Sequence, residues 1–153
     1  MAHSMGNRLL TRALENLVRE PDIQPVFDNV IMAAPDVNAR VFTAIWPQIK
    51  IAAKRFTLYA SSSDKALIAS RKAKGGPDFT RLGEGGPNIT VIPGLDTIDA
   101  SGIDTSLLGH SYEASCKPVR DDLGELIAKG LAPAERRLPP SQTNDGLAYW
   151  RFP

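Results

Sequence analysis

The chain contains few of the residues that support disulfide or metal chemistry. It has one cysteine, Cys116, and two histidines, His3 and His110, in 153 residues. A single cysteine cannot form an internal disulfide, and it excludes a zinc site built on paired cysteines. The two histidines do not have the HExxH spacing of a catalytic zinc site. We therefore expect no metal and no other cofactor.

Several other common signatures are also missing. There is no GxxxxGK phosphate loop and no GxGxxG dinucleotide fingerprint. The formal net charge of +1 gives no general attraction to nucleic acid or anionic membranes, and the short basic clusters at 71–74 and 136–137 are expected to be solvated. No apolar run reaches the roughly 18 residues of a membrane span, and the first residues do not resemble a signal peptide. The default expectation for this chain is a cytoplasmic location.

What is present is an ordinary globular composition, 42% hydrophobic and 23% charged, with alternating elements typical of a parallel sheet covered by helices. A glycine- and proline-rich stretch, 75–87, is expected to be a flexible loop, and 131–153 a polar tail that packs by its aromatic residues. Apolar spacing predicts helices over 7–19 and 36–54. Helices are also expected over 64–73 and over 118–129, the latter with a proline at its first turn and Gly130 past its end. The β-forming runs predict strands over 29–34, 55–60 and 88–92, with a β-like continuation near 97–98.

The first chemical signal is a serine at the start of the first predicted helix. Ser4 has Ala2 two residues before it and Gly6 two residues after it. A nucleophile elbow requires small residues at those places, because its tight turn brings them close together. The backbone N–H of Met5 would then face the site at a helix N-terminus, as one donor of an oxyanion hole. An ordinary helix cap is the alternative interpretation of Ser4.

The candidate base and acid follow from chain order. His3 is next to Ser4 and is poorly placed to act on it, so His110 is the candidate base. Asp64 follows the strand predicted at 55–60 and is the preferred acid, with Asp36 as the alternative. The order Ser, Asp, His is that of α/β-hydrolases. Asp64 could also be only a helix cap, and His110 only a packing residue. One further carboxylate is expected to steady the loop before His110, from Asp96, Asp99 or Asp104.

These motifs resemble a known family over nearly the whole chain. The matching stretches are AHSMGNRLLTRAL, VIMAAPDVNARVF, FTLYASSSDKAL, DTIDASGID, LLGHSY and YWRF. They are similar to the C-terminal portion of a bacterial family of α/β-hydrolases of unassigned substrate, described as esterase/lipase-like. The resemblance implies Ser4 as nucleophile, Asp64 as acid and His110 as base. The fold class we expect is therefore α/β, the C-terminal half of an α/β-hydrolase fold with about three parallel strands covered by helices.

The family also carries an N-terminal half before the elbow, which this chain does not contain. We therefore expect one partial domain over 1–153, without the strand that normally holds the nucleophile and without the second oxyanion donor. Losing one such donor costs about 10²–10³ in rate, so we expect low or no activity from the chain alone. The strand over 29–34 should then expose one apolar edge and favour a homo-oligomer.

The expected function is hydrolysis of a small-molecule ester through an acyl-serine intermediate. A non-catalytic interaction or assembly module is the alternative from another class. An acyltransferase or thioesterase using the same three residues is the second alternative. Nucleic acid is not an expected partner, and this chain has no expected membrane segment.

Overall fold

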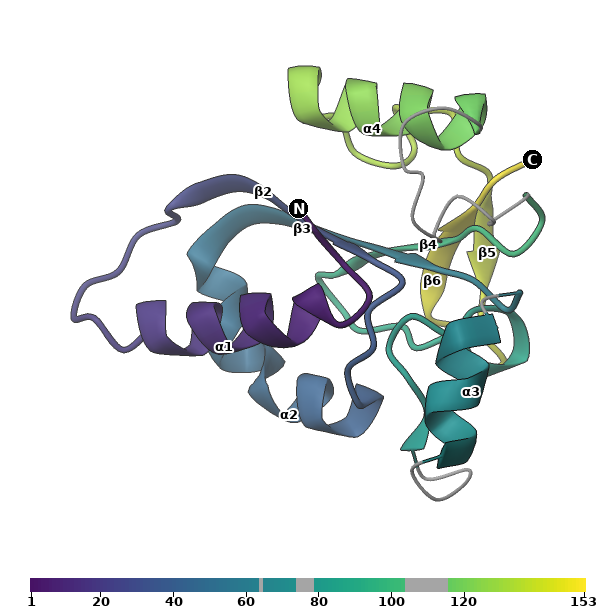
Figure 1. Ribbon diagram of the computed structural model, residues 1–153. Coiled ribbons are helices and arrows are strands. Elements are labelled where there is room, and N and C mark those ends of the chain that lie inside the picture. Colours follow the sequence, from purple (N-terminus) through teal and green to yellow (C-terminus); the bar gives the residue numbers. More distant parts are fainter. Residues whose placement is uncertain (64, 74–78, 104–115) are drawn as a thin grey trace.

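The computed structural model describes residues 1–63, 65–73, 79–103 and 116–153 (Figure 1). They form a six-stranded sheet in which only the pair at the C-terminal edge is antiparallel. In spatial order the strands are β1 (Ala2–His3), β2 (Phe27–Ala33), β3 (Ala53–Ala60), β4 (Asp96–Asp99), β6 (Ala148–Arg151) and β5 (Pro140–Gln142).

Helices cover both faces of this sheet. The helices α1 and α2 lie against one face and α4 lies against the other (Figure 1). A mostly parallel sheet with helices on both faces confirms the predicted α/β class. Among the described helices, none combines the length and the apolar character needed to cross a membrane. The helical elements are α1 (Gly6–Leu17), α2 (Ala39–Ile49), η1 (Lys50–Ala52), α3 (Lys65–Ala73), η3 (Gly86–Asn88) and α4 (Lys117–Lys129).

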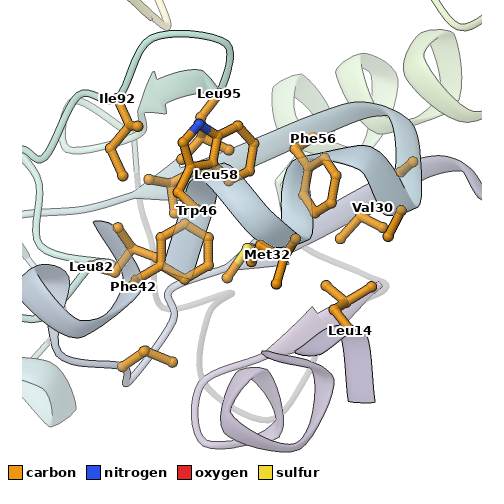
Figure 2. Packing of buried hydrophobic residues seen from close by; sticks show 14 residues of the cluster. Leu14, Val30, Met32, Phe42, Trp46, Phe56, Leu58, Leu82, Ile92 and Leu95 are labelled. Carbon is orange, nitrogen blue, oxygen red and sulfur yellow. The ribbon is translucent and has the colours of Figure 1, made fainter. Parts of the chain in front are cut away.

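The core between α1, α2 and the sheet is apolar and aromatic (Figure 2). Successive strand residues point to opposite faces, and Val30 and Met32 both belong to this core. The ring of Trp46 from α2 meets Phe56 edge-on at 5.0 Å. Trp46 also donates its ring N–H to the carbonyl of Pro93 at 3.1 Å. This face is therefore held mainly by apolar burial.

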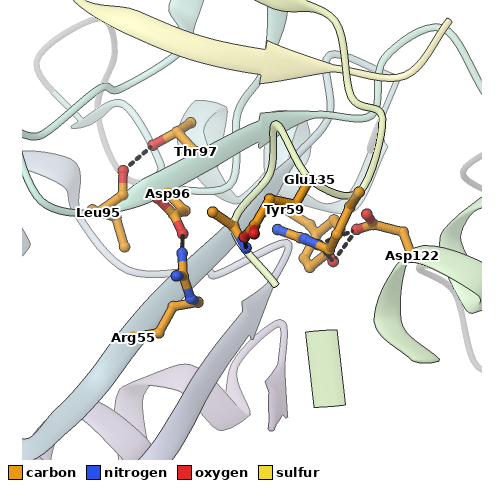
Figure 3. A network of polar contacts seen from close by, with 9 residues as sticks. Arg55, Tyr59, Leu95, Asp96, Thr97, Asp122 and Glu135 are labelled. Carbon is orange, nitrogen blue, oxygen red and sulfur yellow. Dashed lines mark hydrogen bonds and ion pairs between the residues drawn. The ribbon is translucent and has the colours of Figure 1, made fainter. Parts of the chain in front are cut away.

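The opposite face contains a buried polar cluster under α4 (Figure 3). The hydroxyl of Tyr59 donates to Asp122 Oδ2 at 2.5 Å, and Arg136 Nη1 lies 2.5 Å from the same oxygen. The Arg136 side chain is fully buried, so the expectation of a solvated surface at residues 136–137 was wrong for Arg136, whereas Arg137 is exposed. Burial and the neighbouring Asp122 carboxylate raise the pKa of the Tyr59 phenol.

Two strand expectations were wrong. Residues 88–92 are not a strand, because η3 is followed by irregular backbone. The strand next to β3 is β4, which contains the β-like continuation expected near 97–98. The tail predicted over 131–153 contains β5 and β6 and extends the sheet beyond β4. The signal for β6 was its aromatic content, which we had interpreted only as packing. The sheet accordingly has more than the three strands expected.

The buried face of α1 is also rotated from the expected one. Leu9, one of the apolar residues whose spacing predicted this helix, is 77% exposed, whereas Asn7 and Thr11 are buried together with Leu14. Polar residues occupy part of the buried face because they hydrogen-bond there: Thr11 donates its hydroxyl to the carbonyl of Asn7 at 2.7 Å. The apolar pattern therefore predicted the position of this helix in the chain correctly, but it did not predict which face of the helix is buried.

The strand that normally holds the nucleophile, which we expected to be absent, is present as the two residues of β1. Residues of β1 pair in parallel with Met32 and Ala33 at the end of β2. The first part of β2 has no strand on that side among the described residues. The turn that holds Ser4 is thus anchored to the sheet.

Candidate active site

The parallel strands bring four polar segments to one edge of the sheet. Parallel strands end at the same edge, and β1 to β4 are neighbours in that order. Ser4 follows β1, Asp36 follows β2 by three residues, 61–63 follows β3, and 100–103 follows β4. Ligands of open α/β sheets bind outside the carboxyl ends of the strands. This edge is therefore the candidate active site.

Ser4 has a strained backbone between β1 and α1. Its φ of 47° lies in the left-handed region, which costs a residue other than glycine about 1–3 kcal/mol. Its carbonyl accepts bonds from the N–H of Asn7, the side-chain amide of Asn7 and the N–H of Asp36, all at 3.2 Å. Its own N–H donates to the carbonyl of Ala33 at 3.0 Å. These four bonds hold the unfavourable conformation in place.

The groups around the Ser4 hydroxyl have spare hydrogen-bonding capacity. Ser4 is half-buried, and neither its hydroxyl nor the N–H of Met5 bonds to another described residue. The expected reason for a small residue at Gly6 is not seen, because a Cβ there would meet nothing within 4 Å. The N–H of Met5 therefore fits the predicted oxyanion donor, and it lies directly before the first residue of α1.

The loops that leave β3 and β4 are tied together at their first residues. The N–H of Ser62 donates to the Ser101 hydroxyl at 2.8 Å, and the N–H of Ala100 donates to the carbonyl of Ala60 at 2.7 Å. Asp99 accepts from the Ser101 N–H at 3.0 Å and from the Ser101 hydroxyl. Asp99 thus steadies the start of the loop that leads to His110, as one of the three carboxylates was expected to do.

The other two carboxylates of that group have different positions. Asp96 lies at the opposite end of β4, where its Oδ2 pairs with Arg55 Nη1 at 2.5 Å (Figure 3). Asp104 lies outside the described residues.

The glycine-rich segment is packed over the strand ends in its described part. The N–H of Gly83 donates to the carbonyl of Pro35 at 3.0 Å, and its carbonyl accepts from Ser61 at 2.9 Å. A Cβ on Gly83 would lie 2.5 Å from the Ala34 carbonyl carbon, so only glycine fits without displacement of backbone. The expectation of a flexible loop was wrong for residues 79–87.

Asp36, the alternative acid, is already engaged by neighbouring side chains. Its carboxylate is 7% exposed. Its Oδ2 accepts from Arg8 Nη2 at 2.6 Å, and its Oδ1 accepts from the Ser70 hydroxyl at 2.9 Å. Arg81 Nε lies 3.1 Å from Oδ1. These contacts leave little capacity for an imidazole partner.

The other predicted site residues divide into two groups. Ser4 and Met5 lie in the turn between Ala2 of β1 and Gly6 of α1, whereas Asp64 and His110 lie outside the described residues. Sequence reasoning missed Asn7 and the arginines that bind Asp36. The available signal for Asn7 was its helical register: it lies seven residues before the buried Leu14, on the same face of α1.

Within the described ranges, no group of three His, Cys, Asp or Glu side chains could hold a metal ion. A polar cavity of about 460 Å³ lies between residues 86–91 and 142–149. It is next to the β5–β6 edge and so lies across the sheet from Ser4.

The sheet order, the helices on both faces and the turn after β1 define an α/β-hydrolase fold. The comparison with family models agrees: a model described as alpha/beta hydrolase of unknown function (DUF900) matches residues 1–128. Because the match covers most of the chain, the protein belongs to this family. No curated protein and no solved structure matched the chain.

Proposed function

We propose that this α/β-hydrolase family member is a serine hydrolase of the carboxylic ester type. The observation that carries the proposal is the Ser4 turn: a strained serine between a parallel strand and a helix at the carboxyl edge of the sheet. Strained residues cluster at active sites, where the surrounding bonds over-determine them. The hydroxyl of a serine that served only as a helix cap would accept a backbone N–H of the first turn, and no side-chain cap accompanies α1.

The proposed reaction uses Ser4, His110 and Asp64. His110 takes the proton of the Ser4 hydroxyl while the oxygen attacks the ester carbonyl, and the Met5 N–H receives the negative oxygen. The carbon–oxygen bond to the leaving group then breaks, and His110 returns the proton to the leaving alcohol. Water hydrolyses the acyl-serine by the same steps. Asp64 holds the imidazole and stabilises its charged form.

The strand order supports this assignment of roles. Asp64 comes after β3 and His110 comes after β4, and these strands are adjacent and parallel. Adjacent strands lie about 4.8 Å apart, so the two loops begin side by side, and their first residues are hydrogen-bonded to each other. The contacts of Asp36 with two arginines favour Asp64 over Asp36 as the acid.

Labelling with a fluorophosphonate tests the proposal. Each serine has to react only once, so labelling detects an activated serine even where turnover is slow. We expect the mass of the chain to rise by one phosphonyl group, located on Ser4, and we expect Ser4→Ala and His110→Ala to remain unlabelled. A folded wild-type chain that labels no faster than Ser4→Ala would contradict a serine hydrolase and favour the interaction module.

Substrate profiling separates the remaining alternative. Labelled, active protein that transfers its acyl group to an added alcohol or thiol in preference to water would be an acyltransferase, and a preference for thioesters would indicate a thioesterase. We expect neither preference: any turnover should be of oxygen esters, and we expect it to be low or absent for the chain alone.

We further propose that the chain self-associates through β2. Only the end of this strand is paired by β1. Val26, directly before the strand, is 54% exposed, and Phe27, its first residue, is 42% exposed. The C-terminal tail forms β5 and β6 at the opposite edge of the sheet, so these strands do not cover the edge at β2. Light scattering should give at least twice the chain mass of 16.6 kDa, and a monomer at micromolar concentration would contradict this.

A further inference from the structure

A buried carboxylate connects the Ser4 turn to α3. Arg8, in the first turn of α1, donates its Nη2 to Asp36 Oδ2 at 2.6 Å and its Nε to the Asp36 carbonyl at 2.8 Å. On the other side, Ser70 of α3 donates its hydroxyl to Asp36 Oδ1 at 2.9 Å. One carboxylate therefore joins two helices that are far apart in the chain.

A second buried carboxylate, that of Glu84, pairs with Arg71, the residue of α3 that follows Ser70. Arg71 Nη1 lies 2.8 Å from Glu84 Oε2, and the Glu84 side chain is only 4% exposed. Glu84 Oε1 accepts the backbone N–H of Arg81 at 2.9 Å, and Arg81 Nε in turn lies 3.1 Å from Asp36 Oδ1. The two carboxylates and their arginines thus form one continuous network between α1 and α3.

The network closes on the nucleophile. The N–H of Asp36 donates to the carbonyl of Ser4 at 3.2 Å, and Arg8 lies one helical turn after Ser4. Hydrogen bonds shielded from water are strong and directional, and chains of such bonds polarise one another. A shift of α3 would move Ser70 and so change its hydrogen bond to Asp36 Oδ1. Asp36 also donates its N–H to the Ser4 carbonyl, so the same shift would alter a bond that holds the strained turn.

We propose that Asp36 is a positioning residue that couples the conformation of the Ser4 turn to the placement of α3. Its meaning for catalysis rests on the proposed function, because α3 begins directly after Asp64 in the sequence. Coupling would keep the nucleophile and the helix that follows the acid in register. The coupling itself is a property of the folded chain and does not require activity.

Amide hydrogen exchange of the 153-residue chain, followed residue by residue by NMR, tests this inference. The reporters are the amides of Asn7 and Asp36, which both donate to the Ser4 carbonyl. Ser70→Ala, a change on α3, should speed exchange at both reporters by about 3- to 10-fold, the effect expected from one hydrogen bond. Ser70→Thr keeps the hydroxyl and should restore the wild-type rates.

Asp36→Asn should have the larger effect, more than about tenfold at Asn7, because both arginines lose their charged partner. Asp28→Asn is the matched control: Asp28 lies on β2, where it forms an exposed pair with Lys54 at 2.7 Å. Faster exchange in Ser70→Ala that is confined to α3 would overturn the coupling. Exchange does not depend on an activated serine, so failure of Ser4 labelling with coupling present would reject the proposed function alone.

Discussion

The two faces of the sheet hold their helices by different interactions. On the α1–α2 face, apolar side chains such as Phe42 and Ile49 are completely buried. On the α4 face, apolar contacts are joined by the buried bonds between Tyr59, Asp122 and Arg136. Apolar burial has no preferred direction, whereas hydrogen bonds and ion pairs do. The comparison teaches that a buried ion pair helps to set the orientation of α4, which follows the segment carrying His110, as Asn7 and Arg8 do at the start of α1, whereas α2 is held mainly by apolar packing.

Breaking the ion pair under α4 should have the largest effect on stability. Arg136→Met leaves the Asp122 carboxylate buried without its cation, which typically costs about 3–5 kcal/mol of unfolding free energy. The double variant Arg136→Met/Asp122→Leu removes both charges and should recover most of that loss. Urea unfolding measures both. A double variant as unstable as the single one would show that packing, not charge, dominates this face.

On the other face, stability should fall gradually with side-chain size. Ile49, the last residue of α2, is fully buried in the core on this face. Ile49→Val should cost about 0.5–1.5 kcal/mol and Ile49→Ala about 2–5 kcal/mol, since each lost methyl group removes burial and enlarges the cavity. The same urea titrations apply. Equal costs for the two variants would contradict a face held by apolar burial.

The smallest effect concerns pH. Unfolded tyrosine ionises near its ordinary pKa of 10.0, whereas burial and Asp122 raise the pKa of folded Tyr59. The folded state thus keeps its proton above pH 10, and the stability from this group, complete at lower pH, falls as the pH rises. Tyr59→Phe should cost about 1 kcal/mol near neutrality, and the difference from wild type should shrink above pH 10. A difference that stayed constant would contradict the raised pKa.

The same contrast explains what the sequence could predict. Apolar periodicity predicted α1, α2, α3 and α4 and the strands β2 and β3 within a few residues, because burial repeats with the period of each element. It failed where polar contacts decide the structure. Asn7 is buried because its amide bonds two carbonyls, and Arg136 because it meets Asp122.

The site was predictable to a similar extent. The small residues around Ser4 predicted its turn, and chain order predicted which strands precede Asp64 and His110. The contacts of Asp36 reach along the chain as far as Ser70 and Arg81, and no local pattern indicates which distant side chains will meet. The strand expected over 88–92 was misplaced because this apolar run is more strand-like than the alternating DTID segment that pairs with β3. The β-like continuation expected near 97–98 does lie within β4.

An experimental structure that defines both Asp64 and His110 tests the central claim most directly. The account predicts a carboxylate oxygen of Asp64 about 2.6–3.2 Å from an imidazole nitrogen of His110, with the other nitrogen directed at the Ser4 hydroxyl. His110 bonded to Asp36 instead, or directed away from Ser4, would contradict the proposed triad.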